Sequence, residues 1–206
     1  MGKQKNSIAI IGEGITEFYY IRSLVDKYPG ISIKPDYPKH TSVKELSKKI
    51  EECISDGYRY VMCLIDMDTK ENDFEKSAYC KLKSKYSKTV TNLNNGILCD
   101  VIFYESHLCT ELFFLYYFDY TTKYFNSQEN LIKELNKKCY YEKTTKFFRQ
   151  CKGLHSYLER NGGKLEQACE RGDRSVSERE SQPREYTYSD LGKMVEKLDE
   201  LYKQSK

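Results

Sequence analysis

The first half of the chain alternates between continuous apolar runs and patterns with helical spacing. Residues 7–11 are almost wholly apolar and predict a strand that is covered on both faces. From Thr16 onward, apolar side chains recur at helical spacing until Tyr28, Pro29 and Gly30 end the pattern. The order predicts a buried strand, a tight glycine-flanked turn and a helix.

The same alternation continues to about residue 104. Thr41 or Ser42 is a candidate N-cap for a helix that Gly57 ends. Strands that alternate with helices predict an α/β fold with a mainly parallel sheet and helices on its faces. The further strands are predicted at 31–33, 58–65 and 97–104, and the helices at 43–57 and 74–86.

The character of the chain changes after Tyr104. Residues 111–118 are aromatic and apolar with helical continuity, and most of the remaining sequence predicts helices with basic surfaces. Residues 171–185 contain few apolar side chains and predict a mobile loop before a last helix at 189–202. We therefore expect an α/β core over residues 1–105 and a C-terminal helical extension over 106–206 that packs on it, with one continuous domain as the alternative.

Four carboxylates follow the apolar runs. Glu13 and Glu17 come after the first strand, and Asp66 and Asp68 come after the run at 58–65. Open α/β sheets place their sites at such strand ends. Four gathered carboxylates repel one another unless a cation lies between them, and oxygen ligands suit a hard divalent ion. The pattern predicts a Mg²⁺ or Mn²⁺ site, and one ion, or two about 4 Å apart, would suit phosphoryl transfer.

Other interpretations of these acidic turns fit the residues less well. A single Glu or Asp after a strand is often an N-cap or a charge that complements a helix dipole, but a cap needs one carboxylate and not a cluster. The first turn is not a nucleotide-phosphate loop, because no lysine follows at the position that such a loop requires. It is not a dinucleotide-binding turn either, because the third glycine of that motif is missing. A receiver domain carries an adjacent acidic pair after its first strand, whereas Glu13 and Glu17 are separated.

Composition and charge narrow the class of protein. The net charge of +3 comes from 34 basic and 31 acidic side chains, so the balance alone does not select a polyanionic partner. No run approaches the roughly 20 apolar residues of a membrane span, and the first residues lack a signal sequence, so we expect a cytoplasmic protein without membrane contact. The eight cysteines form no C-x-x-C pair and are expected to be reduced thiols.

Four sequence blocks resemble a known family. Glu13, Gly14, Thr16 and Glu17 match its E-G-x-T-E motif, and Asp66 with Asp68 matches its D-x-D motif. The chain is thereby identified as a divergent member of the RloB-like family, which resembles the TOPRIM fold and OLD-type nucleases and is associated with phage defence and abortive infection. The other two blocks are residues 106–118, where Ser106, His107, Thr110, Phe113 and Tyr117 replace family residues, and residues 139–146. In addition, residues 186–195 are similar to the closing helix of the family.

The resemblance implies roles for individual residues. Glu13, Asp66 and Asp68 would be metal ligands with Glu17 as a partner, and Glu13 could instead act as the general base. Glu111 matches the family Glu and would add a carboxylate at the rim, with a surface or capping Glu as the alternative. Lys143 would stabilise charge on the phosphate in the transition state, with a solvated lysine as the alternative.

A basic and aromatic stretch forms a candidate nucleic-acid surface. Lysines and arginines track phosphates, and aromatic rings stack on unpaired bases. The same composition fits a helical lobe with an aromatic core and a lysine exterior. The stretch covers residues 123–164.

The function expected from these features is a metal-dependent nuclease that hydrolyses DNA or RNA in bacterial anti-phage defence. The alternative is a TOPRIM-like binding or regulatory subunit that does not cleave and depends on a partner ATPase, because the chain has no nucleotide-hydrolysing motif of its own. A primase or topoisomerase is disfavoured, because template-handling and strand-passage segments are lacking. The sequence does not determine what triggers cleavage, whether the substrate is DNA, RNA or tRNA, or whether the chain forms a homo-oligomer.

Overall fold

A mostly parallel sheet forms the centre of the computed structural model, which describes residues 7–38, 42–70, 72–92, 96–181 and 187–206. Within these ranges the strand order is β2-β1-β3-β5-β4, and β6 pairs with β5. Neighbours among β1, β2, β3 and β5 are parallel, whereas β4 and β6 run antiparallel to β5. The predicted α/β class is confirmed. The strands are β1 (Ser7–Ile11), β2 (Ser32–Asp36), β3 (Tyr60–Asp66), β4 (Val90–Thr91), β5 (Leu98–His107) and β6 (Tyr188–Ser189).

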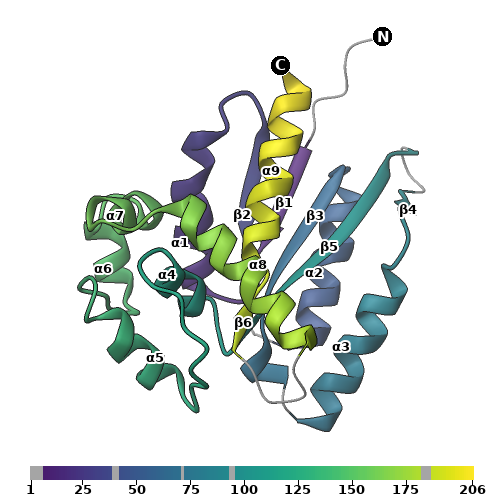
Figure 1. Ribbon diagram of the computed structural model, residues 1–206. Coiled ribbons are helices and arrows are strands. Elements are labelled where there is room, and N and C mark those ends of the chain that lie inside the picture. The colour runs from purple at the N-terminus through teal and green to yellow at the C-terminus, as the bar shows by residue number, and fades with distance from the viewer. Residues whose placement is uncertain (1–6, 39–41, 71, 93–95, 182–186) are drawn as a thin grey trace.

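Helices cover both faces of the sheet, because side chains alternate along each strand. Ile8 and Ile10 face the layer that contains α1 (Ile15–Leu24) and α9 (Leu191–Ser205). Ala9 and Ile11 face α2 (Val43–Ser55) and α3 (Asp73–Lys85) on the other side. Burial on both faces explains why these strands are continuous apolar runs in the sequence. Figure 1 shows α9 lying across the sheet and α2 and α3 on its opposite side.

The second half of the chain is mostly helical and shares the core of the first. One hydrophobic cluster joins Ile8 of β1 to Phe113 and Leu198 from the second half. The division at residue 105 therefore stays a prediction. Figure 1 places α5, α6 and α7 together beside the sheet. The helices of this half before α9 are α4 (Glu111–Tyr116), α5 (Gln128–Leu135), α6 (Thr145–Gln150), α7 (Leu154–Arg160) and α8 (Leu165–Ser181).

Two short 3₁₀ helices connect elements of the first half: η1 (Val25–Lys27) extends α1, and η2 (Met67–Lys70) follows β3. The predicted N-cap at Ser42 is confirmed, because its hydroxyl accepts a hydrogen bond from the backbone N–H of Glu45. This hydrogen bond fixes where α2 begins. The alternative N-cap, Thr41, lies outside the described residues.

The predicted loop at 171–185 is wrong over residues 171–181, which belong to α8. This part of α8 packs through small residues instead of large apolar ones: Gly172 and Ser175 are buried. A Cβ on Gly172 would lie 2.8 Å from the carbonyl oxygen of Ser189, so the helix approaches β6 closely. Low apolar content therefore did not mean low order. Residues 182–186 lie outside the described residues.

Two simpler expectations concern membranes and cysteines. Among the helices in the described ranges, none combines the length and apolarity that crossing a bilayer demands.

All eight cysteines are free thiols, and six of them are buried. The burial of most of the cysteines is shown, and their reduced state stays a prediction.

Candidate functional site

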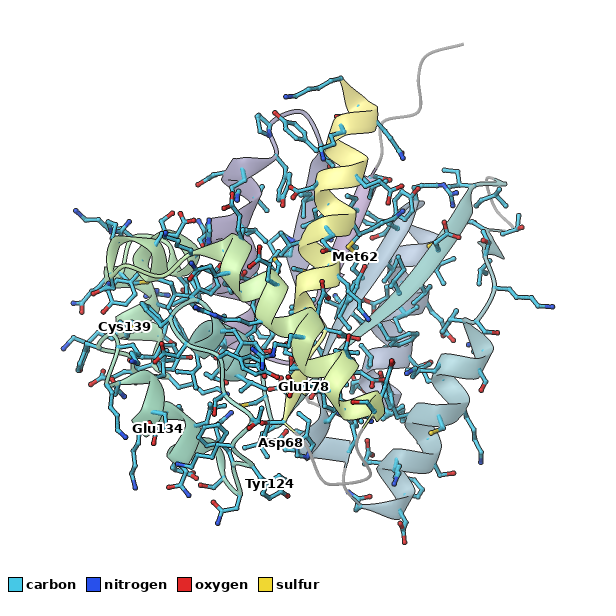
Figure 2. The ribbon with its side chains drawn as sticks, viewed as in Figure 1. Met62, Asp68, Tyr124, Glu134, Cys139 and Glu178 are labelled. Atoms are coloured by element: carbon cyan, nitrogen blue, oxygen red, sulfur yellow. The ribbon has the colours of Figure 1, made fainter. Side chains whose placement is uncertain are left out.

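The predicted acidic residues come together at the carboxyl end of the sheet. β1 and β3 are adjacent and parallel, so Glu13 after β1 and Asp66 at the end of β3 emerge at the same edge. β5 lies beside β3 and leads into α4, which begins at Glu111. Four carboxylates are buried here: Glu13, Glu17, Asp66 and Glu111. In Figure 2, Met62 marks the middle of β3 and the half-buried Asp68 lies beyond its carboxyl end, in η2.

The turn between β1 and α1 positions Glu17. A Cβ on Gly12 would lie 2.2 Å from the Cβ of Glu17, so only glycine lets the first turn of α1 come this close to β1. The backbone N–H of Gly14 donates to Oε2 of Glu17 at 2.8 Å. The other oxygen, Oε1, is buried and has no hydrogen-bond partner among the residues that the structure describes. Burial and the nearby Glu111 raise the pKa of Glu17.

Asp66 is held by Thr110, the residue directly before α4. The backbone N–H and the hydroxyl of Thr110 donate to its Oδ1 at 2.8 and 3.0 Å. Burial raises the pKa of Asp66 well above its usual value, and the charges of Glu17, Glu111 and Glu13 add to that rise. An ionised Asp66 is therefore costly in this site unless positive charge is supplied.

Glu111 is buried at the centre of a hydrogen-bonded group and does not lie at a solvent-exposed rim. The Tyr141 hydroxyl donates to its Oε1 at 2.8 Å, and the Gln128 amide reaches Oε2 at 3.4 Å. Nζ of Lys143 lies 3.4 Å from Oε1. The exposed fraction of the Lys143 side chain is 34%, so this lysine connects the buried carboxylate with solvent.

The charge of Lys143 is stabilised by the centre as a whole. Burial alone would lower the pKa of its ammonium group, but Glu111, Glu17 and Asp66 outweigh burial and raise it. Lys143 and the three carboxylates therefore share one electrostatic environment. Lys143 therefore lies among the carboxylates of the acidic centre. A solvated surface lysine, the alternative, would not have these carboxylates around it.

A second lysine, which the sequence interpretation missed, neutralises Glu13. Nζ of Lys70 lies 2.6 Å from Oε1 of Glu13, and the side chain of Lys70 is fully buried. The Thr69 hydroxyl donates to Oε2 of Glu13 at 3.0 Å. Burial nevertheless raises the pKa of Glu13 to about 7, against the opposing effects of Lys70 and Thr69. The sequence feature that could have indicated Lys70 is its position two residues after Asp68, in the acidic turn.

The chemistry of this donor set suits a hard divalent cation. Carboxylate oxygens are the ligands that Mg²⁺ and Mn²⁺ prefer. Oε1 of Glu17 is a buried acceptor without a hydrogen bond from the described residues, and a bound cation would satisfy it. Within the described ranges, however, no group of three or more His, Cys, Asp or Glu side chains is arranged to hold a metal ion. Glu13 is turned to Lys70, and Asp66 to Thr110. Joint ligation by these carboxylates therefore requires side chains to turn.

The aromatic residues of the candidate nucleic-acid surface are divided between core and solvent. Tyr141, Phe147 and Phe148 are buried. Tyr124 and Tyr140 are exposed. A polar cavity of about 470 Å³ lies between α1 and α6, and its basic lining residues are Arg22, Arg149 and Lys152. The basic side chains thus face solvent on a lobe whose aromatic residues are mainly core, and nucleic-acid binding stays a prediction.

Comparison with known proteins identifies a family. The family model described as RloB-like protein matches residues 8–198, a span that contains every residue of the candidate site. No curated protein and no solved structure matches the chain. The predicted family is thereby confirmed, and its relationship to the TOPRIM fold and OLD-type nucleases stays a prediction.

Proposed function

The chain belongs to the RloB-like protein family, and we propose that it is a cytoplasmic, metal-dependent nuclease of anti-phage defence. The observation that carries this proposal is the gathering of four buried carboxylates at the ends of adjacent parallel strands, with two lysines beside them. Burying so much negative charge is costly, and folding alone offers no reason for it.

The proposed metal site uses the carboxylates that the sequence singled out. Glu13, Glu17, Asp66 and Asp68 would hold Mg²⁺ or Mn²⁺ through oxygen ligands. When bound, such an ion polarises a phosphodiester and lowers the pKa of a water that attacks it. Thr110 orients Asp66 through two hydrogen bonds, as partners of metal ligands commonly do.

The residues beside the metal ligands would manage charge and protons. Lys143 is partly exposed and lies among carboxylates, so it can reach a phosphate that approaches from solvent and stabilise its developing charge. In its alternative role as general base, Glu13 has a pKa that burial raises to about 7, which suits a group that accepts a proton from water near neutral pH. Glu111 keeps Lys143 in place and is itself fixed by Tyr141.

The proposed substrate is nucleic acid, approached through the basic surface of the second half. The lining of the α1–α6 cavity offers Arg22, Arg149 and Lys152 for contacts with phosphate groups. These contacts are independent of base sequence, so they leave DNA and RNA as equal candidates.

A cleavage assay with a panel of substrates tests the proposal. Plasmid, single-stranded DNA and total tRNA are incubated with the full chain and Mg²⁺ or Mn²⁺, with chelator added to a parallel set. The expected result is cleavage of at least one substrate that chelator abolishes. Cleavage that persists in chelator would contradict a metal-dependent mechanism, and no cleavage would contradict a nuclease that acts alone.

A second candidate is a subunit that binds nucleic acid without cleaving it and depends on a partner ATPase. The hydrogen bonds that engage Glu13 and Asp66 favour it, because carboxylates with such protein partners can serve structure alone. Nucleic-acid binding without cleavage, with or without metal, would favour this candidate.

A further inference from the structure

Lys70 is a fully buried lysine inside the acidic centre. Its side chain has an exposed fraction of 0%, and its Nζ contacts Oε1 of Glu13 at 2.6 Å. Lysine is almost never fully buried unless it is paired, because an ammonium group loses its hydration. Oε2 of Glu13 lies 3.0 Å from the Thr69 hydroxyl, which also contacts Nζ of Lys70. Protein donors therefore already engage both oxygens of Glu13.

The two remaining buried carboxylates are compensated less directly, through the charge of the nearby Lys143. In the part of the chain that the structure describes, Glu17 and Asp66 form no ion pair, whereas Glu13 is paired with Lys70 and Glu111 with Lys143. Glu17 has a buried Oε1 without a hydrogen-bond partner. Among the described contacts, the carboxylate of Asp66 receives hydrogen bonds only at Oδ1. Among the four buried carboxylates, the negative charge that lacks a direct ion-pair partner is thus concentrated on these two side chains.

We propose that Lys70 is a built-in cation that neutralises Glu13 and limits the centre to one divalent ion, held on the side of Glu17 and Asp66. The inference rests on the proposed function, because it requires that the centre bind Mg²⁺ or Mn²⁺. In two-ion sites the ions lie about 4 Å apart and share carboxylates. An ammonium group fixed on Glu13 repels a second divalent ion from that carboxylate. Lys70 is accordingly a positioning residue of the site.

The experiment counts ions directly. Mn²⁺ binding to the full chain is titrated by electron paramagnetic resonance of the free ion, which needs no substrate or activity. Wild type is expected to bind one Mn²⁺ per chain. Lys70→Met, which keeps the length of the side chain without its charge, is expected to bind a second Mn²⁺. Lys70→Arg is expected to retain one.

A matched control uses a lysine that is paired with a carboxylate elsewhere. Lys83 pairs with Glu105, which is not one of the four buried carboxylates, so Lys83→Met is expected to bind one Mn²⁺ as wild type does. Thermal melts followed by circular dichroism show whether each variant is folded. If Lys70→Met does not fold, the wild-type count still decides, because one ion supports the proposal and two overturn it.

The outcomes separate this inference from the proposed function. One ion in both wild type and Lys70→Met, with equal affinity, would overturn the role of Lys70 and leave the metal site standing. Two ions in wild type would also overturn it while supporting metal binding. Absence of binding in both proteins would overturn the inference and the proposed metal dependence together.

Discussion

Thr110 donates two hydrogen bonds to Oδ1 of Asp66, from its backbone N–H at 2.8 Å and from its hydroxyl at 3.0 Å. The two residues belong to segments that lie 44 positions apart in the sequence. Their contact ties the end of β3 to the start of α4, and so joins the D-x-D turn to the turn that carries Glu111.

Removing the charge of Asp66 is expected to stabilise the fold. In Asp66→Asn, the amide oxygen can still accept both hydrogen bonds from Thr110, while the repulsion by Glu17 and Glu111 is lost. We expect Tm to rise by several degrees, since 1 kcal/mol shifts Tm by about 2–4 °C for a chain of this size. Differential scanning calorimetry in chelator measures it. The control, Asp100→Asn, removes a partly exposed ion pair with Arg59 and should change Tm little, and a lower Tm for Asp66→Asn would contradict charge repulsion in the centre.

The glycines of the first turn differ sharply in what they tolerate. In Gly12→Ala the new Cβ would lie 2.2 Å from Cβ of Glu17, so the first turn of α1 must move. In Gly14→Ala the nearest atom is Oε2 of Glu17 at 3.5 Å, and the backbone is extended, which any residue adopts. We expect Gly12→Ala to lower Tm by several degrees and to weaken Mn²⁺ binding at least tenfold, and Gly14→Ala to do neither. Similar Tm values for the two variants would argue against the close approach.

Two neighbouring tyrosines provide a matched pair for the role of Glu111. Tyr141→Phe removes a buried hydrogen bond of 2.8 Å to its carboxylate, and an unsatisfied buried partner costs about 1–3 kcal/mol. Tyr140→Phe removes a hydroxyl that lies at the surface and contacts Glu142. Urea unfolding should show a loss of about 1–3 kcal/mol for the first variant and less than about 0.5 kcal/mol for the second. Equal losses would show that burial of Glu111 does not depend on Tyr141.

The stability of the metal-free protein should fall as pH rises through about 7. Burial raises the pKa of Glu13 from 4.5 to about 7, so the folded state keeps a proton that the unfolded state has already released. The resulting stabilisation is complete below the unfolded pKa and is lost as pH rises through the folded pKa. Burial likewise raises the pKa of Asp190 to about 7, with the same sign.

Urea unfolding in chelator between pH 5.5 and 8.5 measures this dependence. Glu13→Gln should flatten the decline, because only the part due to Asp190 and the other buried carboxylates remains. Its overall stability should be lower, since Lys70 then lacks its charged partner. A slope equal to that of wild type would show that Glu13 does not titrate in this range.

The sequence predicted most of the core because local patterns report burial directly. β1 and β3 are apolar runs, and the predicted sheet class follows from their alternation with helices. The helix at residues 171–181 was missed because it packs through Gly172 and Ser175, and small residues of this kind are also typical of loops. Neither β4 nor β6 was predicted, because strands of two residues carry no periodicity.

The candidate site was only half predictable for a similar reason. Glu13, Glu17 and Asp66 follow strands, and topology alone brings strand ends together. Thr110, Tyr141 and Gln128 reach the site from segments that are distant in the sequence. The first two lie in blocks that resemble the family, but no local pattern predicts their hydrogen bonds to the carboxylates. Lys70 is next to the D-x-D turn, but surface lysines are too common for a position alone to indicate that this one is buried.

Catalysis by the acidic centre is tested by the single-turnover rate of phosphodiester cleavage in Mn²⁺, compared between wild type and Asp66→Asn. The substrate is the one that wild type cleaves in the panel, and thermal melts establish that both proteins are folded. We predict a loss of at least a hundredfold in Asp66→Asn without loss of fold, since a metal ligand is removed. An unchanged rate would contradict the assignment of the acidic centre as the catalytic site.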